Sequence, residues 1–554
     1  MDKNVKNDQR IDPTEVLHVH INNKKVRKSA AFDFWRVFSI VFGNSIGVGI
    51  YLKSKQALLT AHNPYIVLIV LFLMSFIGVS MVFVFIELGT SAKNRYHTHT
   101  CFAETFIGRR TGSMFSLFYC IIYIPVYVGL MAITVSYYIF RVIDDYYDNS
   151  VWMNQDLEAF LIIFIAVFII FFMCISNGYA SNGWFKYLHI FFNNLKFLPL
   201  ILVLGLGIYA KFYFNTTAFT DKNTSQWNFS YFILVIPMLL FELDGFMYGS
   251  SIEKEITHKR MLVFGQVVGV ILVVSVNVLF ALSLYFGTTD ADSFSLISTV
   301  LPKDWALVLK LIIAIVVLGS VAGFTSFGVI NLSSTTDNNG VQLVYFKKSQ
   351  KMISHRLSGY INAILISTVL IVLTTTSWVI YKNSLNRTNK ESEYYYVGQA
   401  VTFLIDKISD SVVVLAFTTY LILMVAALIN HKTKKVNDVM NVKGNIYYNI
   451  VASSIMSFFL AYIYYDIFKK FGSNDIGQIL QPLFVIIFLL LLFITFIINE
   501  VKLSKVNIDT NDFILRINPK NWTKKYNKQE AISNYKIKNK NFYSSLIIDN
   551  EEKK

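Results

Sequence analysis

Three ionisable side chains interrupt long apolar stretches of this 554-residue sequence. Glu242 and Asp244 belong to FELDGFMYGSSIEKEI, and Lys196 belongs to NNLKFLPLILVLGLG. An ionised carboxylate at the centre of a bilayer costs roughly 3 kcal/mol or more, so such residues usually bind a partner or a charged ligand. A lysine removed from water can release its proton. The chemistry that these residues suggest is therefore the binding of charged groups and the transfer of protons.

The spacing of Glu242 and Asp244 predicts an opening in the helix. Two residues correspond to about 200° of rotation, so a regular helix cannot turn both carboxyl groups into one cavity. Either one of them faces lipid or the helix opens. Gly245 follows at once, and Gly249 and two serines come soon after, which favours opening. The alternative is that one carboxyl group is protonated or packs as a structural polar contact.

Lys196 is a candidate proton carrier. It lies nine residues beyond Tyr187 at the predicted cytoplasmic end, which is about 14 Å along a helix. Its side chain extends about 6 Å and could only partly reach back to the surface. The alternative is a lysine that bridges carbonyl groups at a helix end.

A glycine-rich stretch, FGNSIGVGIY from Phe42 to Tyr51, predicts a second break. Each glycine costs about 1 kcal/mol of helix propensity relative to alanine, and Asn44 and Ser45 are poor helix formers. The alternative is close packing, because Gly43 and Gly47 form a GxxxG pair. A third glycine two residues later is not explained by packing, so we favour a broken helix.

The composition places these residues in a polytopic membrane protein. Hydrophobic residues make up 54% of the chain and charged residues 15%, and the mean hydropathy is +0.49, values outside the soluble globular range. A bilayer crossing needs roughly 20 apolar residues, and the first 34 residues contain no cleavable signal peptide. Twelve candidate spans are present: 35–56, 65–88, 113–141, 158–176, 187–211, 229–253, 261–287, 305–331, 357–381, 409–430, 446–465 and 476–499.

The charges predict the orientation. The net charge is +15, and Lys and Arg gather before the first span and in alternate loops. Because basic loops stay in the cytoplasm, we expect both termini to be cytoplasmic in the plasma membrane. The basic bias thus reflects topology, and we expect no nucleic-acid partner. The partners expected are a small molecule and the lipid bilayer.

The two interrupted spans each open a block of five, which predicts an inverted repeat. Since five is odd, the second block enters the membrane from the opposite side. The expected organisation is an N-terminal tail, two five-helix repeats, two further helices and a basic cytoplasmic tail, at 1–34, 35–211, 212–430, 431–500 and 501–554.

Two facing helix breaks also predict a class of ligand. Free N–H groups at a half-helix N-terminus suit a carboxylate. The carbonyl groups freed at the other half-helix ends suit an ammonium. A zwitterionic amino acid carries both groups.

Several stretches resemble the amino acid–polyamine–organocation transporters. GNSIGVGIY is similar to the first-helix motif of that family, and FIELGT, at 85–90, is similar to the end of its second helix. ISNGYASNGWFKYLHIFFNNLKFLPL, at 175–200, and FELDGFMYGSSIEKEI, at 241–256, resemble its fourth-to-fifth joint and its sixth helix. The resemblance covers about residues 35–430. It implies an all-α fold of twelve transmembrane helices with a LeuT-like 5+5 core and discontinuous first and sixth helices.

The resemblance also implies a binding site. The substrate carboxylate would meet N–H groups near Val48 and Gly49, the ammonium would meet carbonyls at Ser45, Phe241 and Asp244, and Phe241 would be an aromatic gate. Lys196 matches a lysine that occupies the place of a sodium ion in proton-coupled members. The complete set of expected binding residues is Gly43, Asn44, Ser45, Ile46, Gly47, Val48, Gly49, Phe241, Glu242, Asp244 and Gly245.

Three departures leave the substrate open. Asn331 lies where the family often has an arginine, and Lys254 replaces the first residue of a frequent glutamate pair. Tyr119, Tyr123 and Tyr127 occupy the third helix where some carriers of cationic amino acids have an acidic contact.

The expected function is proton-coupled uptake of an amino acid, with a cationic side chain favoured if Glu242 and Asp244 line the pocket. We expect no catalytic group, metal or cofactor, because the proton gradient would supply the energy. The alternatives are an amino acid or polyamine exchanger without net proton flux and a sensor that binds without transport.

Overall fold

The computed structural model describes fifteen parts of the chain, and these are helical throughout with short turns and no strand. They are residues 30–91, 99–147, 154–179, 191–192, 195–214, 229–247, 249, 256, 258–288, 291–337, 353–388, 397–434, 436, 444–472 and 476–504. The expectation of an all-α protein is confirmed for these residues. Both predicted tails, apart from a few residues next to the helices, lie outside them.

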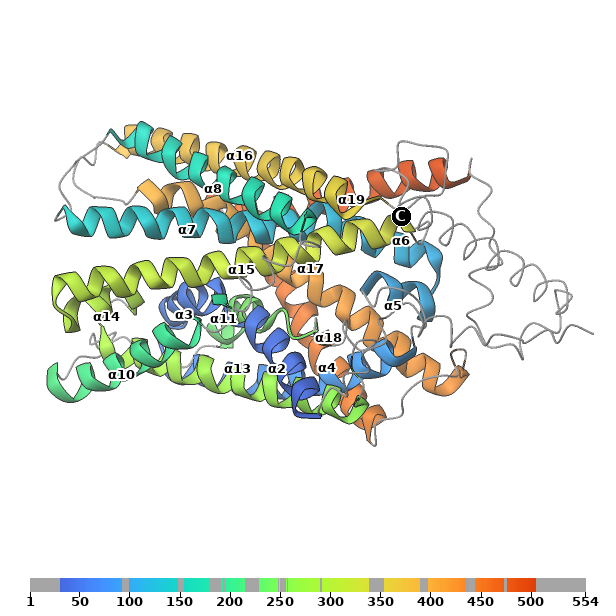
Figure 1. The fold of residues 1–554 in the computed structure, drawn as a ribbon. Coiled ribbons are helices and arrows are strands. Elements are labelled where there is room, and N and C mark those ends of the chain that lie inside the picture. Colours follow the sequence, from blue (N-terminus) through green and yellow to red (C-terminus); the bar gives the residue numbers. More distant parts are fainter. Residues whose placement is uncertain are drawn as a thin grey trace, which may run out of the picture.

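Helices of different lengths make up the bundle shown in Figure 1. In chain order they are α2 (Ala30–Ser45), α3 (Val48–Ala61), α4 (Pro64–Ser91), α5 (His99–Phe106), α6 (Arg109–Leu117), the π-helix η1 (Phe118–Tyr123), α7 (Ile124–Tyr146), α8 (Gln155–Gly178), α10 (Phe197–Phe214), α11 (Phe229–Leu243), α13 (Lys259–Gly287), α14 (Ser293–Val300), α15 (Lys303–Asp337), α16 (His355–Thr388), α17 (Val397–Thr433), α18 (Asn445–Lys469), the 3-10 turn η4 (Lys470–Gly472) and α19 (Ile476–Ser504).

The described residues contain ten helices long and apolar enough to cross a membrane, and α2 with α3 forms one bent span in addition. Each of the twelve predicted stretches overlaps a helix in the described part of the chain. The count of twelve crossings is not confirmed, because α11 has only 15 residues and most of the sequence that would continue it lies outside the described residues.

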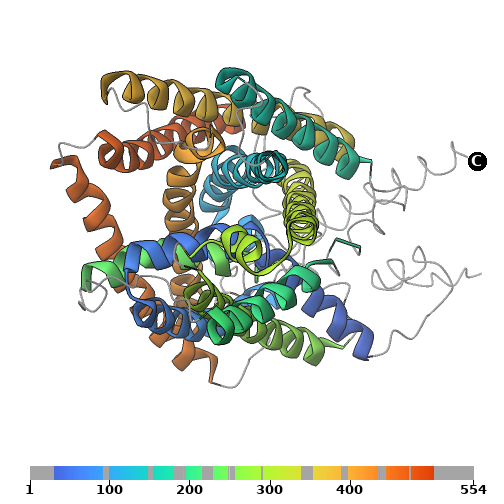
Figure 2. The ribbon, with the colours of Figure 1, turned by 90° about the vertical axis from the view of Figure 1, so that its left-hand side faces the viewer.

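The helices of the two predicted repeats pack in matching pairs. In the described chain, α3 packs on α11, α4 on α13, α7 on α15 and α8 on α16. Figures 1 and 2 show α7 beside α15 and α8 beside α16. In these four pairs each helix contacts the helix five places later, as expected of two blocks related by an axis in the membrane plane. The boundary between the repeats stays a prediction.

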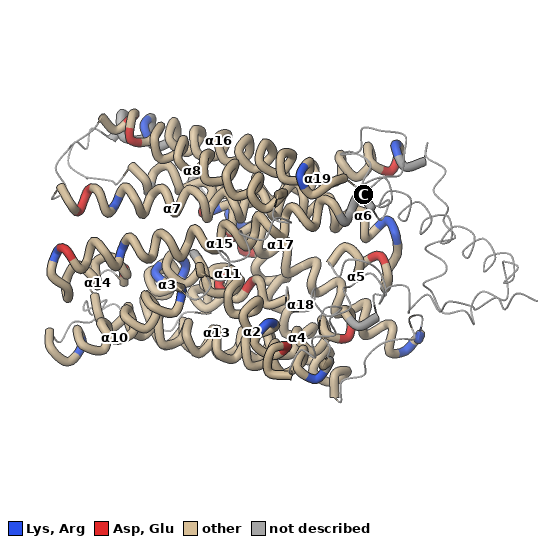
Figure 3. The backbone as a smooth tube through the Cα atoms, viewed as in Figure 1, with Lys and Arg blue, Asp and Glu red and all other residues tan. Residues whose placement is uncertain are grey.

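Burial sets the centre and the periphery of the bundle. The apolar window of the span Arg109–Tyr146 is 94% buried, whereas that of Ile479–Lys502 is 17% buried. The element α7 therefore forms the central post, and α19 faces the surroundings along most of its length. Figure 3 shows charged residues at the two ends of the bundle and a further interior group near α3 and α11.

Candidate functional site

The first span breaks within the glycine-rich stretch. The helix α2 ends at Ser45 and α3 starts at Val48, and their axes differ by 48°. A Cβ atom on Gly47 would lie 2.5 Å from Ser320 Oγ of α15, so this glycine permits close approach of a neighbouring helix. The first N–H groups of α3 lack acceptors within the helix. The predicted break is confirmed.

The sixth span also opens where the sequence predicted. The helix α11 ends at Leu243, and residues 244–247 form turns. Gly245 has a φ of +109°, a conformation that side chains other than glycine rarely adopt. A Cβ atom there would lie 3.1 Å from the backbone carbon of Asn44, and one on Gly49 would lie 3.2 Å from Glu242 Cα. The two breaks therefore pack directly against one another.

Asp244 is held by three tyrosine hydroxyl groups. Tyr123 of η1 and Tyr127 of α7 donate to its Oδ2 atom at 2.6 and 2.7 Å. Tyr420 of α17 donates to Oδ1 at 3.0 Å, where the N–H of Gly245 also donates, at 2.9 Å. Two of the three tyrosines singled out in the third span, Tyr123 and Tyr127, thus contact the acid of the sixth span. We call Tyr123, Tyr127 and Tyr420 the tyrosine cage.

A π-helical turn positions these tyrosines. The segment η1 widens the helix just before Pro125, which lacks the N–H group that would bond to the preceding turn. Tyr119, Tyr123 and Tyr127 form a ladder, with ring centroids 5.0 Å apart for the first pair and 4.5 Å for the second. Tyr119 is bonded to Thr419 of α17 at 3.0 Å.

Glu242 points in another direction from Asp244. Its Oε1 atom accepts a hydrogen bond from Ser54 of α3 at 2.7 Å. Its Oε2 atom is buried and has no hydrogen-bond partner among the described residues. Both acids are at most 2% exposed, so neither faces lipid. The open turn thus lets one carboxyl group face α3 and the other the tyrosine cage.

Lys196 joins the first break to α15. The residue is 1% exposed, and its Nζ atom donates to the carbonyl oxygen of Gly43 and, at 3.1 Å, to Ser320 Oγ. Gly43 lies in the last turn of α2, so Lys196 binds a helix-end carbonyl, as the alternative interpretation expected. It does so within the interior, next to the break, rather than by reaching the surface.

A buried charge cluster was not predicted from the sequence. Lys53 of α3 is fully buried, and its Nζ atom lies 2.7 Å from Asp406 and 2.6 Å from Asp410 of α17. Gln56 also donates to Asp406, at 2.6 Å. The ammonium of Lys53 lies 5.3 Å from the centre of the Phe241 ring. This cluster ties α3 to α17 beside Phe241.

Phe241 lies between the helix breaks and that cluster. Its ring stacks on Tyr127 with centroids 4.5 Å apart and planes 11° apart, and it is 4% exposed. Phe241 is therefore packed between Tyr127 of α7 and the ammonium of Lys53.

A second ion-pair group holds the connection before α14 against α3 and α7. Asp292 lies 2.9 Å from Arg141 and 3.4 Å from Lys55. Burial alone raises the pKa of this carboxyl group, but the neighbouring cations Arg141 and Lys55 outweigh it and hold the pKa below the ordinary 3.8. Asp292 is thus an anion at neutral pH that fixes the turn to two helices.

The comparison with protein families decides the class. The sequence profile described as "Amino acid permease" matches residues 32–515. This chain belongs to the amino acid permease family. No protein in the curated set matches the permease. Its family and its many apolar spans make it a multi-pass membrane protein for transport of amino acids or similar substrates.

Solved structures share the fold at low sequence identity. The manganese transporter of Eremococcus coleocola, bound to an aromatic bis-isothiourea compound, is 12% identical with a TM-score of 0.54, over 88% of the permease and 97% of that chain. A single-residue variant of that transporter is 14% identical with a TM-score of 0.52, over 86% and 96%. MhsT in complex with L-phenylalanine is 10% identical with a TM-score of 0.49, over 78% and 97%. The likeness to the manganese transporter confirms the LeuT-like fold.

Proposed function

We propose that this permease takes up an amino acid by alternating access, in symport with protons. The observation that carries the proposal is the contact of Lys196 with Gly43 and Ser320. It places an ionisable group on the backbone of the first helix break and on a helix of the other repeat. A change in its protonation would act on the two parts that must move relative to each other.

The proposed amino acid binds chiefly through backbone groups. Its carboxylate is received by N–H groups of the first turn of α3, at Val48 and Gly49, where the helix dipole is positive. Its ammonium is received by carbonyl groups at Ser45 and Phe241. The packing of Gly49 on Glu242 and of Gly245 on Asn44 supports this arrangement, because it brings the two breaks together.

For the side chain we propose a cationic group that meets Glu242. The carboxyl group of Asp244 already receives four hydrogen bonds. Oε2 of Glu242 has none from the described residues. A lysine or arginine substrate would supply the missing donor.

Uptake into proteoliposomes tests the coupling. With one proton carried per substrate, an inward gradient of one pH unit should sustain about a tenfold accumulation, because 1.4 kcal/mol is a factor of ten. Lys196→Met should bind the amino acid but lose the dependence on the gradient. Lys211→Met is the matched control, because Lys211 lies in the last turn of α10, the helix that begins directly after Lys196.

Other outcomes would replace the proposal. Uptake by the unaltered protein that ignores the gradient rules out proton symport, and a requirement for internal substrate then identifies an exchanger. Binding without flux would identify a sensor.

A further inference from the structure

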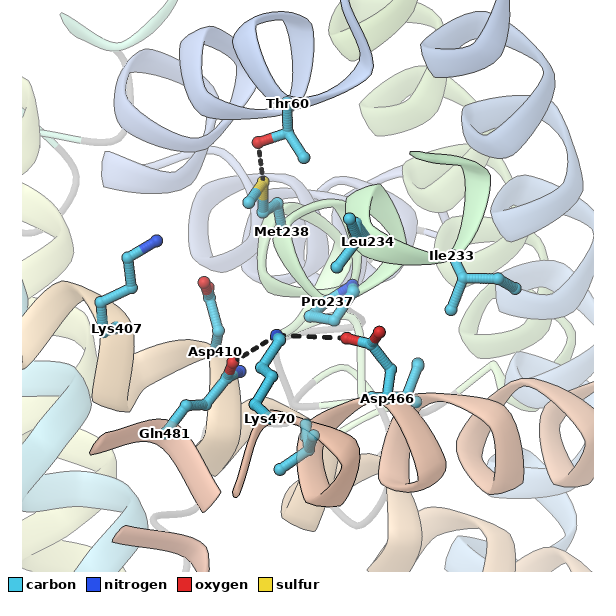
Figure 4. A pocket seen from close by; sticks show the side chains of 12 residues that line it. Thr60, Ile233, Leu234, Pro237, Met238, Lys407, Asp410, Asp466, Lys470 and Gln481 are labelled. Atoms are coloured by element: carbon cyan, nitrogen blue, oxygen red, sulfur yellow. Dashed lines mark hydrogen bonds and ion pairs between the residues drawn. The ribbon is translucent and has the colours of Figure 1, made fainter. Parts of the chain in front are cut away.

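A cavity lies away from the helix breaks, on the far side of the Lys53 cluster. Its volume is about 140 Å³, and residues of α3, α11, α17, α18, η4 and α19 line it (Figure 4). None of the residues expected to bind substrate is among them. The proposed transport site therefore leaves this cavity without a role.

Two opposite charges on α17 face this cavity. Lys407 and Asp410 both line it, and they project from the helix in the same direction in Figure 4. Residues three apart on a helix are neighbours and often pair when their charges are opposite. In the described chain Lys407 has no hydrogen bond or ion pair, and Asp410 is bonded to Lys53 through Oδ1 alone. Each charge thus has binding capacity left.

The other charged residues of the cavity, Asp466 and Lys470, bond to one another, and Lys470 also bonds to Gln481. Lys470 lies 3.1 Å from Asp466 and donates to Gln481 at 2.9 Å, as the dashed lines in Figure 4 show. Most of the remaining lining is aliphatic, including Leu234 and Met238. The cavity therefore offers one cation, one anion and a short apolar wall.

We propose that this cavity is a second binding site, for a small zwitterionic solute whose carboxylate meets Lys407 and whose ammonium meets Asp410. The cavity volume of about 140 Å³ is well below the 300–1,000 Å³ of a site for drug-sized ligands. The ligand is therefore an amino acid with a very short side chain, such as glycine. The proposal does not depend on the transport mechanism, because it rests on other residues.

The site shares a carboxyl group with the cluster that joins α3 to α17. Oδ1 of Asp410 binds Lys53, and the proposed ammonium takes the other oxygen. Occupancy of the cavity therefore acts on the contact between the first span and α17.

Equilibrium binding of radiolabelled glycine to the purified full chain tests the proposal. The protein is placed in nanodiscs of phosphatidylcholine, because its quaternary ammonium, unlike the ammonium of ethanolamine headgroups, cannot donate a hydrogen bond to Asp410. Lys407→Gln should weaken glycine binding at one site about tenfold or more, because it removes a charge-assisted contact. Lys469→Gln is the matched control. Lys469 is an exposed lysine at the end of α18 that borders the cavity, but it does not line the cavity. It should change the affinity less than twofold.

A second variant and two fragments complete the experiment. Leu234→Trp fills the cavity without changing its charge and should abolish the same binding event. Methylamine and acetate, which each carry one of the two charges, should bind at least tenfold more weakly than glycine. Glycine binding unaltered by both Lys407→Gln and Leu234→Trp would overturn the proposal, as would acetate binding as tightly as glycine.

The result can be separated from that of the transport experiment. Glycine binding that depends on Lys407 in a protein without uptake keeps the second site and removes the proposed function. Uptake without Lys407-dependent glycine binding keeps the proposed function and removes the second site.

Discussion

The tyrosine cage makes a graded prediction about stability. Removing one hydroxyl group from the cage leaves Asp244 buried with one donor fewer. A hydrogen bond contributes about 0.5–1.5 kcal/mol, or about 1.5–3 kcal/mol when one partner is ionised. Tyr123→Phe and Tyr127→Phe, whose bonds measure 2.6 and 2.7 Å, should each lower the free energy of unfolding by about 1–3 kcal/mol. Tyr420→Phe, with a bond of 3.0 Å, should cost less.

The chain supplies its own control for this series. Tyr51 of α3 is 1% exposed, and its hydroxyl group has no hydrogen-bond partner among the described residues. Tyr51→Phe deletes the same atom from an equally buried ring. It should leave the stability unchanged or raise it by up to about 1 kcal/mol, because an unsatisfied polar atom is removed.

The measurement is unfolding of the purified protein by sodium dodecyl sulfate in mixed micelles. A double-mutant cycle between Tyr123→Phe and Asp244→Asn should give a coupling energy of about 1 kcal/mol or more. Additive effects within about 0.5 kcal/mol, or a loss for Tyr51→Phe as large as for Tyr123→Phe, would refute the view that the cage holds Asp244.

Two further predictions concern the second break and the ion pairs beside α14. Gly245→Ala should cost about 1–3 kcal/mol of stability and reduce uptake, because alanine is strained at a φ of +109°; stability and uptake equal to those of the unaltered protein would show that the turn can relax. Asp292→Asn should destabilise the protein at pH 7 and should destabilise it less at pH 3. A folded-state pKa below 3.8 means that the carboxylate stabilises fully above about pH 4 and progressively less as the pH falls through that folded-state pKa. Unfolding measured at both pH values checks this, and an equal loss at both would contradict it.

The sequence predicted those features that the types of residue within an apolar stretch reveal by themselves. Glycines and polar residues inside apolar stretches indicated both helix breaks, because unwinding there costs little. Lys196 stood out because a lysine is costly at that depth. The all-α membrane fold and the family were likewise predicted and are confirmed.

The pairing of charges could not be read from the chain. Lys53 and Asp406 are separated by 353 residues. Neither local sequence indicates that its charged residue pairs with the other. Asp406 and Asp410 lie four residues apart at the start of an apolar span, which was an available sign of an intramembrane anion site. The sequence also did not show that Asp244 accepts the hydrogen bonds of Tyr123 and Tyr127. The orientation of the Asp244 side chain depends on the geometry of a turn, and local propensity does not specify that geometry.

The pairing of each helix with its counterpart five places later has a consequence for biosynthesis. The central post α7 starts at Ile124, and its partner α15 starts at Lys303, about 180 residues later. At about 5–20 residues per second, the ribosome needs roughly 10–35 seconds to supply that partner. During this interval the tyrosines and other inward-facing groups of α7 lie in the insertion machinery or in lipid. Damage to the second repeat would therefore leave the first as an unpaired target for membrane quality control.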